Sequence, residues 1–163
     1  MIIGFSGHQK IDHPERWGWV REQFDTVLRE RQGDGTRIVV ALAKGGDQAF
    51  TEAALALGLP VDIVLPCSLY ENTFKGEDAK ATYRGLLARG ARVETLEYVE
   101  PSQDAFLAAG KYVVDHCDLL VTLWNGKAAA GKGGTGDVVE YARSLGRPLI
   151  HVHPDLLEVT GPA

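Results

Sequence analysis

Short apolar runs alternate with longer amphipathic segments along the chain. The apolar runs are rich in β-branched residues, which is typical of strands buried on both faces of a sheet. Strands are expected at Ile2–Phe5, Arg37–Leu42, Val61–Leu65, Arg92–Leu96, Asp118–Trp124 and Leu149–Val152. Apolar residues recur at helical spacing between them. Helices are therefore expected at Pro14–Arg31, Gln48–Leu57, Asp78–Arg89, Asp104–His116 and Thr135–Leu145.

This regular alternation of strand and helix predicts an α/β protein with a mostly parallel sheet. Crossovers between parallel strands are right-handed, so helices should cover both faces of the sheet in a Rossmann-like, three-layer fold. The strands at Ile2–Phe5, Arg37–Leu42 and Asp118–Trp124 should lie at its centre, because they are the most apolar. No repeat, linker or low-complexity segment divides the 163 residues, and a single nucleotide-binding domain over residues 1–163 is expected.

Composition narrows the class of protein. Acidic residues outnumber basic ones by 22 to 17, and the net charge is −5. Proteins that bind nucleic acid usually carry a basic face, so no nucleic-acid partner is expected. A small anionic ligand stays open, because backbone N–H groups can bind phosphate without net positive charge.

Several classes of site are not expected. Cys67 and Cys117 are far apart and outside any Cys-x-x-Cys motif, which argues against zinc and disulfides. His151 and His153 lack a partner at metal-ligand spacing, and we interpret them as structural. No signal peptide precedes the first strand, and no stretch approaches the roughly 18 apolar residues of a membrane helix. We therefore expect a cytoplasmic protein with no metal, no cofactor and no membrane partner.

Three loops that follow expected strands carry small residues. They are Ser6-Gly7-His8-Gln9, Lys44-Gly45-Gly46-Asp47 and Gly131-Lys132-Gly133-Gly134-Thr135. Open parallel sheets bind ligands at the carboxyl ends of their strands, near the point where strand order reverses. Because a parallel sheet brings these ends to one edge, the three loops are expected to line one cleft.

The loop before the last helix is the most informative of the three. Gly133 and Gly134 let a phosphate approach the backbone, and the positive end of the helix dipole favours an anion there. The hydroxyl of Thr135 either caps the helix or donates to a phosphate oxygen. An ordinary glycine loop with a threonine cap is the alternative interpretation.

The other two loops are more ambiguous. Lys44, Gly45, Gly46 and Asp47 repeat the same arrangement, but Asp47 could equally be a helix cap in a tight turn. Neither a Walker A motif nor the Gly-x-Gly-x-x-Gly fingerprint is present. His8 is either a ligand contact or proton carrier, or a partly exposed loop histidine.

Three residues near the last glycine loop could take part in chemistry. Trp124 ends a strand and could stack on a base, or form part of the core wall. Asp137 and Glu140 lie three residues apart on the following helix, where either could act as acid, base or ribose ligand. Their alternative role is to complement the positive helix N-terminus.

At these loops the sequence resembles the SLOG superfamily, which joins the Lonely Guy phosphoribohydrolases with the Rossmann-like domain of DNA-processing protein A. The resemblance runs from Ile2 to about Pro154 and rests on three stretches, Ile3–His8, Leu42–Val61 and Asp118–Ala142. It implies a Rossmann-like nucleotide-binding domain that pairs as a homodimer. The phosphoribohydrolases carry Pro-Gly-Gly-x-Gly-Thr-x-x-Glu, with the glutamate active in cleavage. Here Val138 stands three residues after Thr135, and no proline precedes the glycines.

The sequence thus supports three hypotheses. The first is a module, such as a signal sensor, that binds a small nucleotide or nucleotide-derived phosphate ligand. In this hypothesis the three glycine loops hold the phosphate and Trp124 contacts the base. The second is an enzyme that cleaves the N-glycosidic bond of a nucleoside monophosphate through Asp137 or Glu140. The third is a scaffold whose ligand site is vestigial.

Overall fold

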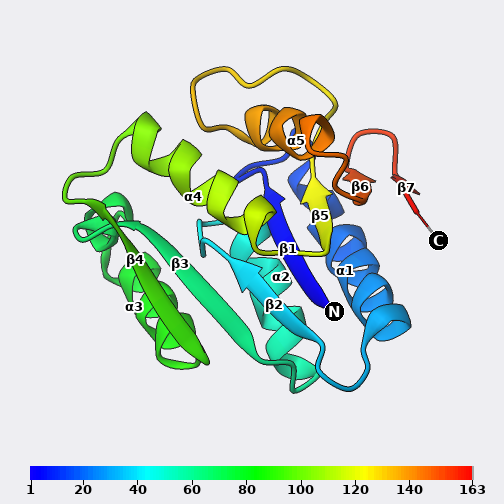
Figure 1. Cartoon of the computed structure of the whole chain (residues 1–163), viewed down its shortest axis with the longest axis horizontal. Helices are drawn as coiled ribbons and strands as arrows, with labels where there is room; N and C mark the ends of the chain where they lie inside the picture. The colour runs from blue at the N-terminus through cyan, green and yellow to red at the C-terminus, as the bar shows by residue number, and fades with distance from the viewer. Residues whose placement is uncertain (163) are drawn as a thin grey trace.

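The computed structural model describes residues 1–162. A seven-stranded sheet runs through it in the order β4-β3-β2-β1-β5-β6-β7 (Figure 1). All neighbouring strands are parallel except β6 and β7. The strands are β1 (Ile2–Gly7), β2 (Arg37–Val40), β3 (Val61–Cys67), β4 (Arg92–Tyr98), β5 (Leu119–Leu123), β6 (Leu149–His153) and β7 (Glu158–Thr160).

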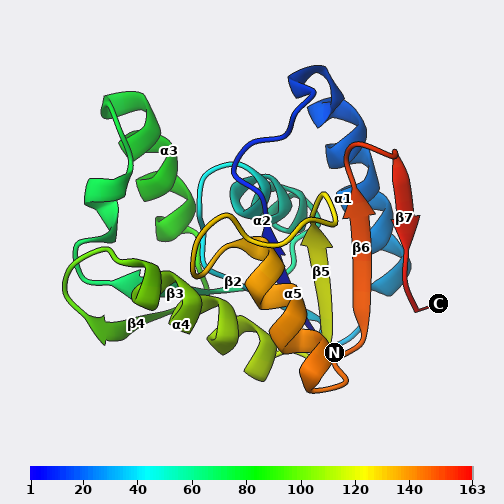
Figure 2. The same cartoon turned by 90° about the horizontal axis from the view of Figure 1, so that it is seen from above.

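Helices cover both faces of this sheet, which confirms the expected three-layer α/β fold. Figure 2 shows α1, α2 and α3 on one face and α4 and α5 on the other. The helices are α1 (Trp17–Arg31), α2 (Gly46–Ala56), α3 (Glu77–Ala88), α4 (Gln103–Asp115) and α5 (Thr135–Ser144). Short 3-10 turns precede α1 at Pro14–Arg16 and α3 at Tyr70–Thr73. No helix within residues 1–162 is long and apolar enough to cross a membrane.

Three phenylalanine side chains, from β1, α1 and α2, pack together in the core. Phe5 stacks on Phe50 of α2 with ring centroids 4.4 Å apart, and both rings meet Phe24 of α1 edge-on. All three side chains are fully buried. On the opposite face, a Cβ on Gly110 of α4 would lie 2.5 Å from Val138 of α5, so these two helices pack in close contact. These contacts fix α1 and α2 on one face of the sheet and α4 and α5 on the other.

Strand order reverses between β1 and β5. Residues from β1 to β4 progress toward one edge of the sheet, and β5 and β6 progress toward the other. The N–H of His8 donates to the carbonyl of Leu123 at 3.0 Å, which ties the ends of β1 and β5 together. In open α/β sheets such a switch point is where ligands bind.

The structure differs from the sequence-based prediction at two places. Strand β2 ends at Val40, because Leu42 has a φ of 63° and so leaves the extended conformation. The chain turns there to let Asp47 reach back to the backbone of Ala43. The predicted C-terminal tail instead forms β7, the antiparallel partner of β6. The predicted central strands are confirmed, since β1, β2 and β5 are all interior.

Candidate functional site

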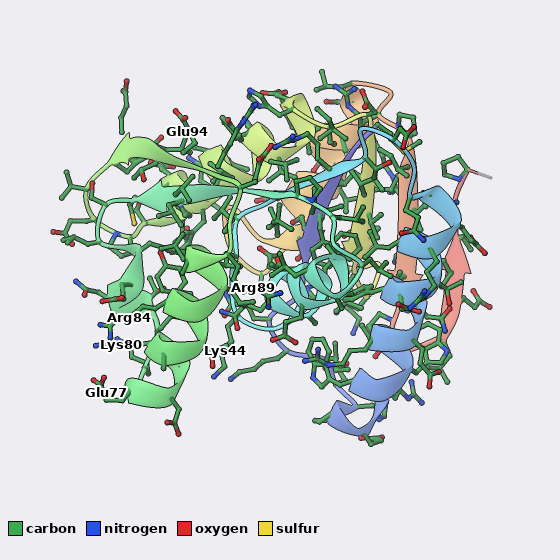
Figure 3. All side chains as sticks on the ribbon, turned by 90° about the horizontal axis from the view of Figure 1, so that it is seen from below. Lys44, Glu77, Lys80, Arg84, Arg89 and Glu94 are labelled. Atoms are coloured by element: carbon green, nitrogen blue, oxygen red, sulfur yellow. The ribbon has the colours of Figure 1, made fainter. Side chains whose placement is uncertain are left out.

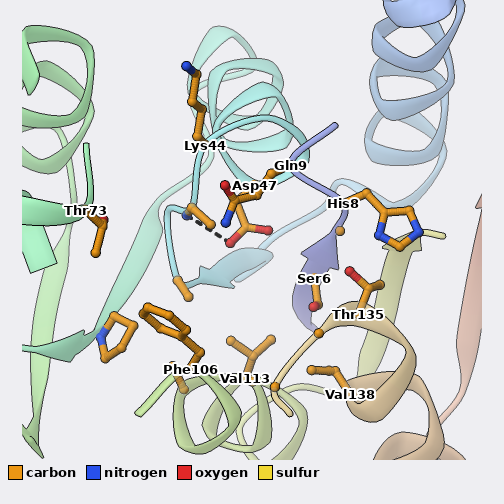
Figure 4. A pocket seen from close by; sticks show the side chains of 18 of the residues that line it. Ser6, His8, Gln9, Lys44, Asp47, Thr73, Phe106, Val113, Thr135 and Val138 are labelled. Atoms are coloured by element: carbon orange, nitrogen blue, oxygen red, sulfur yellow. Dashed lines mark hydrogen bonds between the residues drawn. The ribbon is translucent and has the colours of Figure 1, made fainter. Parts of the chain in front are cut away.

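A cavity of about 620 Å³ opens at the carboxyl ends of β1, β2 and β3. Its volume lies within the range of small-molecule sites, roughly 300–1,000 Å³. Residues from all three glycine loops line it, together with residues of α4 and of the 3-10 turn before α3 (Figure 4). The structure therefore gathers the three loops on one cavity, as a parallel sheet requires.

Most of the residues singled out from the loop sequences lie along this cavity. The lining members are Ser6, Gly7, His8, Lys44, Asp47, Gly133, Gly134 and Thr135. Gly45 and Gly46 do not line it. A Cβ on Gly45 would lie 2.2 Å from the carbonyl oxygen of Gln9, and the N–H of Gly46 donates to the carbonyl of His8. These two glycines allow the loops after β1 and β2 to pack together.

The N-terminus of α5 faces the cavity. Gly134 is the N-cap residue, and as a glycine it has no side chain that could cap the helix. Thr135 is the first helical residue, so its hydroxyl is not the cap that the sequence left open. The N–H groups of Thr135 and Gly136 meet no protein acceptor within residues 1–162. Free N–H groups at a helix N-terminus bind anions, and this end of the cavity can therefore hold a phosphate or carboxylate.

The glycines before α5 line the cavity and also determine how the loop packs. Gly133 has a φ of 88°, and a Cβ there would approach the backbone of Gln103 and Leu107 in α4 to within 2.9 Å. A Cβ on Gly134 would point at Ala129, 3.0 Å away. Gly133 therefore requires glycine, because the loop folds against the backbone of α4 there, whereas Gly134 only leaves little room beside Ala129.

Asp47 is the carboxylate of the cavity. Its side chain is 4% exposed and accepts a hydrogen bond from the N–H of Ala43 at 3.1 Å. Burial raises the pKa of Asp47 to about 7, although hydrogen bonds from the backbone of Ala43 and Gly7 oppose that shift. An acid that titrates near neutral pH inside a cavity is typical of a functional site.

His8 stands where the cavity meets the end of β5. Its Nε2 accepts a hydrogen bond from the N–H of Asn125 at 3.1 Å, which fixes the neutral tautomer with the proton on Nδ1. Burial lowers the pKa of His8 below its usual value. His8 is therefore uncharged at neutral pH and can offer one hydrogen-bond donor.

Three residues predicted near the chemistry do not line the cavity. Trp124 is 8% exposed, donates from Nε1 to the carbonyl of Lys127 and packs beside His151, so it has the core-wall role. Asp137 accepts a hydrogen bond from the N–H of Gly133 at 2.9 Å and stabilises the loop. Glu140 is exposed on the following turn of α5. The sequence places these residues near a strand end, but residue spacing does not show whether a side chain points into the cavity.

The cavity instead acquires an aromatic wall that the sequence analysis missed. Tyr70 and Phe74 are buried beside it, and Phe106 of α4 is half-buried with its ring 6.3 Å from that of Tyr70. Tyr70 and Phe74 fall between the strand predicted at Val61–Leu65 and the helix predicted at Asp78–Arg89, and Phe106 falls in the helix predicted at Asp104–His116. The aromatic residues at 70 and 74, close after a strand end, were the one available signal.

Positive charge gathers around the cavity although the chain is acidic. Lysines at three positions line it, and Asp47 is its one lining carboxylate within residues 1–162; the lysines are Lys44, Lys75 and Lys132. Lys132 pairs with Asp104. Figure 3 shows Lys44 near α2, whereas Lys80 and Arg84 lie on the side of α3 away from it, where Arg84 pairs with Glu71. The side chains that line the cavity therefore include more basic than acidic groups, in contrast to the whole chain.

The strand order, and the cavity at the carboxyl ends of the strands, define a Rossmann-like α/β domain. Its structure is similar to DNA-processing protein A from Helicobacter pylori, with a TM-score of 0.65 and 21% identity over 93% of this chain and 64% of that one. The same protein from Streptococcus pneumoniae matches with a TM-score of 0.66 and 20% identity over 91% and 49%. This chain thus spans less than two thirds of either protein.

A third similar structure is TM1055, a structural genomics target. It gives a TM-score of 0.57 and 14% identity over 91% of this chain and 71% of that one. No family model and no curated protein matches the sequence. At these identities the likeness establishes the fold, and it confirms the expected resemblance to the Rossmann-like domain of DNA-processing protein A at that level.

These comparisons correct one prediction. The net charge led us to expect no nucleic-acid partner, but the Helicobacter pylori protein with this fold is described as binding single-stranded DNA. Net charge averages over the whole surface, whereas three lysines line this one cavity. The net charge of this chain is therefore not a reason to exclude a nucleic-acid partner.

Proposed function

We propose that the cavity binds a nucleotide through its phosphate. The observation that carries this proposal is the N-terminus of α5, where the N–H of Thr135, which lines the cavity, has no protein acceptor. The hydroxyls of Ser6 and Thr135 lie on the same side of the cavity (Figure 4). Together they supply the donors that a phosphate group requires.

The opposite side of the cavity suits the rest of a nucleotide. Tyr70, Phe74 and Phe106 give it an apolar, aromatic surface against which a base can stack. The lysines at the rim raise the local concentration of an anionic ligand. A purely apolar ligand would leave the free donors at α5 unsatisfied on binding.

Binding is better supported than cleavage of the N-glycosidic bond. The cleavage hypothesis assigned the catalytic carboxylate to Asp137 or Glu140, and neither of these lines the cavity. A general acid or base must come within hydrogen-bond reach of the atom on which it acts. The vestigial scaffold is less well supported, because the cavity keeps free donors and buried polar groups.

A second candidate is single-stranded nucleic acid, with one nucleotide of the strand in the same cavity. The observation in its favour is the fold shared with the Helicobacter pylori protein, which is described as binding single-stranded DNA. Such binding would weaken steeply with salt, since phosphate contacts displace counterions. A free mononucleotide would then compete with the strand for the cavity.

The test is calorimetric titration with the four ribonucleoside monophosphates and their parent nucleosides. We expect at least one monophosphate to bind about tenfold or more tightly than its nucleoside, since one charge-assisted hydrogen bond contributes roughly 1.5–3 kcal/mol. The double variant Ser6→Ala, Thr135→Val removes the two hydroxyl donors and keeps the backbone donors, so it should reduce this preference without abolishing it. Thr26→Val on the exposed face of α1 is the matched control and should retain it.

Two further measurements separate the candidates. A labelled single-stranded oligonucleotide that binds and is displaced by a monophosphate supports the second candidate. Release of free base during incubation with a monophosphate supports the enzyme instead. Equal affinity for nucleosides and monophosphates in the parent protein would overturn the phosphate site.

A further inference from the structure

The cavity has a polar middle section as well as its two ends. Figure 4 shows Ser6 and Thr135 on one side and Phe106 on the other, with Asp47 projecting from α2 between them. A nucleotide has the same order of groups, with the sugar between phosphate and base. A ligand whose phosphate lies at α5 and whose base lies against Phe106 would present its sugar to Asp47.

Asp47 joins the loops after β1 and β2, since the backbone of Ala43 and of Gly7 donates to its carboxylate, and the same side chain also lines the cavity. It lies in the first turn of α2, where an exposed carboxylate would complement the helix dipole equally well. Instead, its side chain is buried and accepts a bond from Ala43, and Tyr70 packs close enough for Asp47 to contribute to the raised pKa of the phenol. Burying an ionisable group destabilises the fold. Its presence in the cavity wall therefore points to a ligand.

We propose that Asp47 accepts hydrogen bonds from the ribose hydroxyls of the bound nucleotide, with the base against Phe106. The inference rests on the proposed phosphate site and deepens it by naming the ligand class, a ribonucleoside 5′-monophosphate. An ionised carboxyl group is an acceptor only, with room for more than one donor. The adjacent 2′ and 3′ hydroxyls of ribose supply two donors, and deoxyribose supplies one.

The same chemistry could come from a free nucleotide or from the end of an RNA strand. In both cases the contact is made by one ribose beside one phosphate. A deoxyribonucleotide leaves one bond to Asp47 unmade, and a buried carboxylate that loses a donor is destabilised. Discrimination by a missing hydroxyl is strong when the site is built around that hydroxyl.

The experiment compares the tightest-binding ribonucleotide from the titrations with its 2′-deoxy form. We expect the ribonucleotide to bind about tenfold more tightly, because one lost bond to a charged group is worth about 1.5 kcal/mol or more. Asp47→Asn keeps an oxygen for the N–H of Ala43 and should reduce this preference to about threefold or less. Asp34→Asn, in the exposed turn before β2, is the matched control and should leave it unchanged.

Further arms separate the outcomes. A 5′-phosphorylated oligoribonucleotide that binds more tightly than the mononucleotide assigns the ribose to an RNA end, and weaker binding assigns it to a free nucleotide. Equal affinity for ribo and deoxy forms, both phosphate-dependent, would overturn the role of Asp47 and leave the phosphate site standing. Loss of phosphate dependence would overturn the proposed function itself. Phe106→Leu should weaken both forms alike, and an unchanged affinity would overturn the base position.

Discussion

The two glycine loops before α2 and α5 look alike in sequence and differ in structure. In the loop before α2, the backbone is closed on itself, since Gly46 donates to the carbonyl of His8 and Gln48 to that of Ala43. In the loop before α5, the N–H groups of Thr135 and Gly136 stay free of protein acceptors within residues 1–162. The first loop presents a side chain, Asp47, to the cavity, and the second presents its backbone.

The difference teaches that glycines at a strand end have two distinct uses. Gly45 and Gly133 both have positive φ angles, of 85° and 88°, and both lie against a neighbouring backbone. Their role is to let two segments of chain approach each other. Anion binding depends instead on which N–H groups the loop leaves unpaired, and glycine content does not report that.

The largest expected effect is on stability, from Gly45→Ala. The new methyl group would lie 2.2 Å from the carbonyl oxygen of Gln9, a backbone atom that cannot move without shifting the end of β1. We expect a loss of about 3 kcal/mol or more, measured by chemical denaturation. Gly58→Ala is the control, because Gly58 has a φ of 72° but open space around it, and should lose only about 1–2 kcal/mol. Equal losses would mean that the two loops do not pack as described.

The fold was largely predictable from the sequence, and the site only in part. Period and β-branched content located β1, β2 and β5, because strands buried on both faces leave a continuous apolar run. Spacing could not show that Trp124 turns into the core or that Asp137 bonds to Gly133, since both depend on side-chain direction. Phe106 lines the cavity beside Tyr70, a residue far away in the sequence, and no local pattern reveals that contact.

The next effect concerns the side chain that the first loop presents. The pKa of Asp47 is raised from 3.8 to about 7 in the folded protein, so the folded state binds a proton more tightly than the unfolded state. The free energy of unfolding should therefore fall as pH rises from about 4 to about 7, by at most about 4 kcal/mol, and then level off. Asp47→Asn should remove this slope and be the more stable protein at pH 8.

The control for the titration is a carboxylate with the opposite environment. Glu71 is partly exposed and its pKa is lowered by the guanidinium of Arg84, so Glu71→Gln should leave the slope between pH 4 and pH 7 in place. Denaturation curves at several pH values measure both variants. A slope that persists in Asp47→Asn would show that another group is responsible for it.

A smaller effect tests whether the hydroxyl of Thr135, in the loop before α5, is free of a capping role. Ser102 caps α4 by accepting a bond from the N–H of Ala105 at 3.0 Å, and Ser102→Ala should lower stability by about 1 kcal/mol. Thr135 caps nothing, so Thr135→Val should leave the melting temperature nearly unchanged while it weakens monophosphate binding. A melting temperature that falls as far in Thr135→Val as in Ser102→Ala would restore the capping role and weaken the phosphate assignment.

The smallest expected effect concerns the charge beside the free N–H groups. Asp137 places a carboxylate in the first turn of α5, where it bonds to Gly133 and repels any phosphate bound at the helix end. Asp137→Asn keeps an acceptor for that N–H and removes the charge, so monophosphate affinity should rise about two- to fivefold, since such charge effects are worth roughly 0.3–1 kcal/mol. Glu140→Gln, one turn further and exposed, should change affinity less. The enzyme hypothesis makes the opposite prediction, because a catalytic Asp137 would lose base release on conversion to asparagine. Titration and base release on the same two variants therefore decide whether this carboxylate opposes the ligand or acts on it.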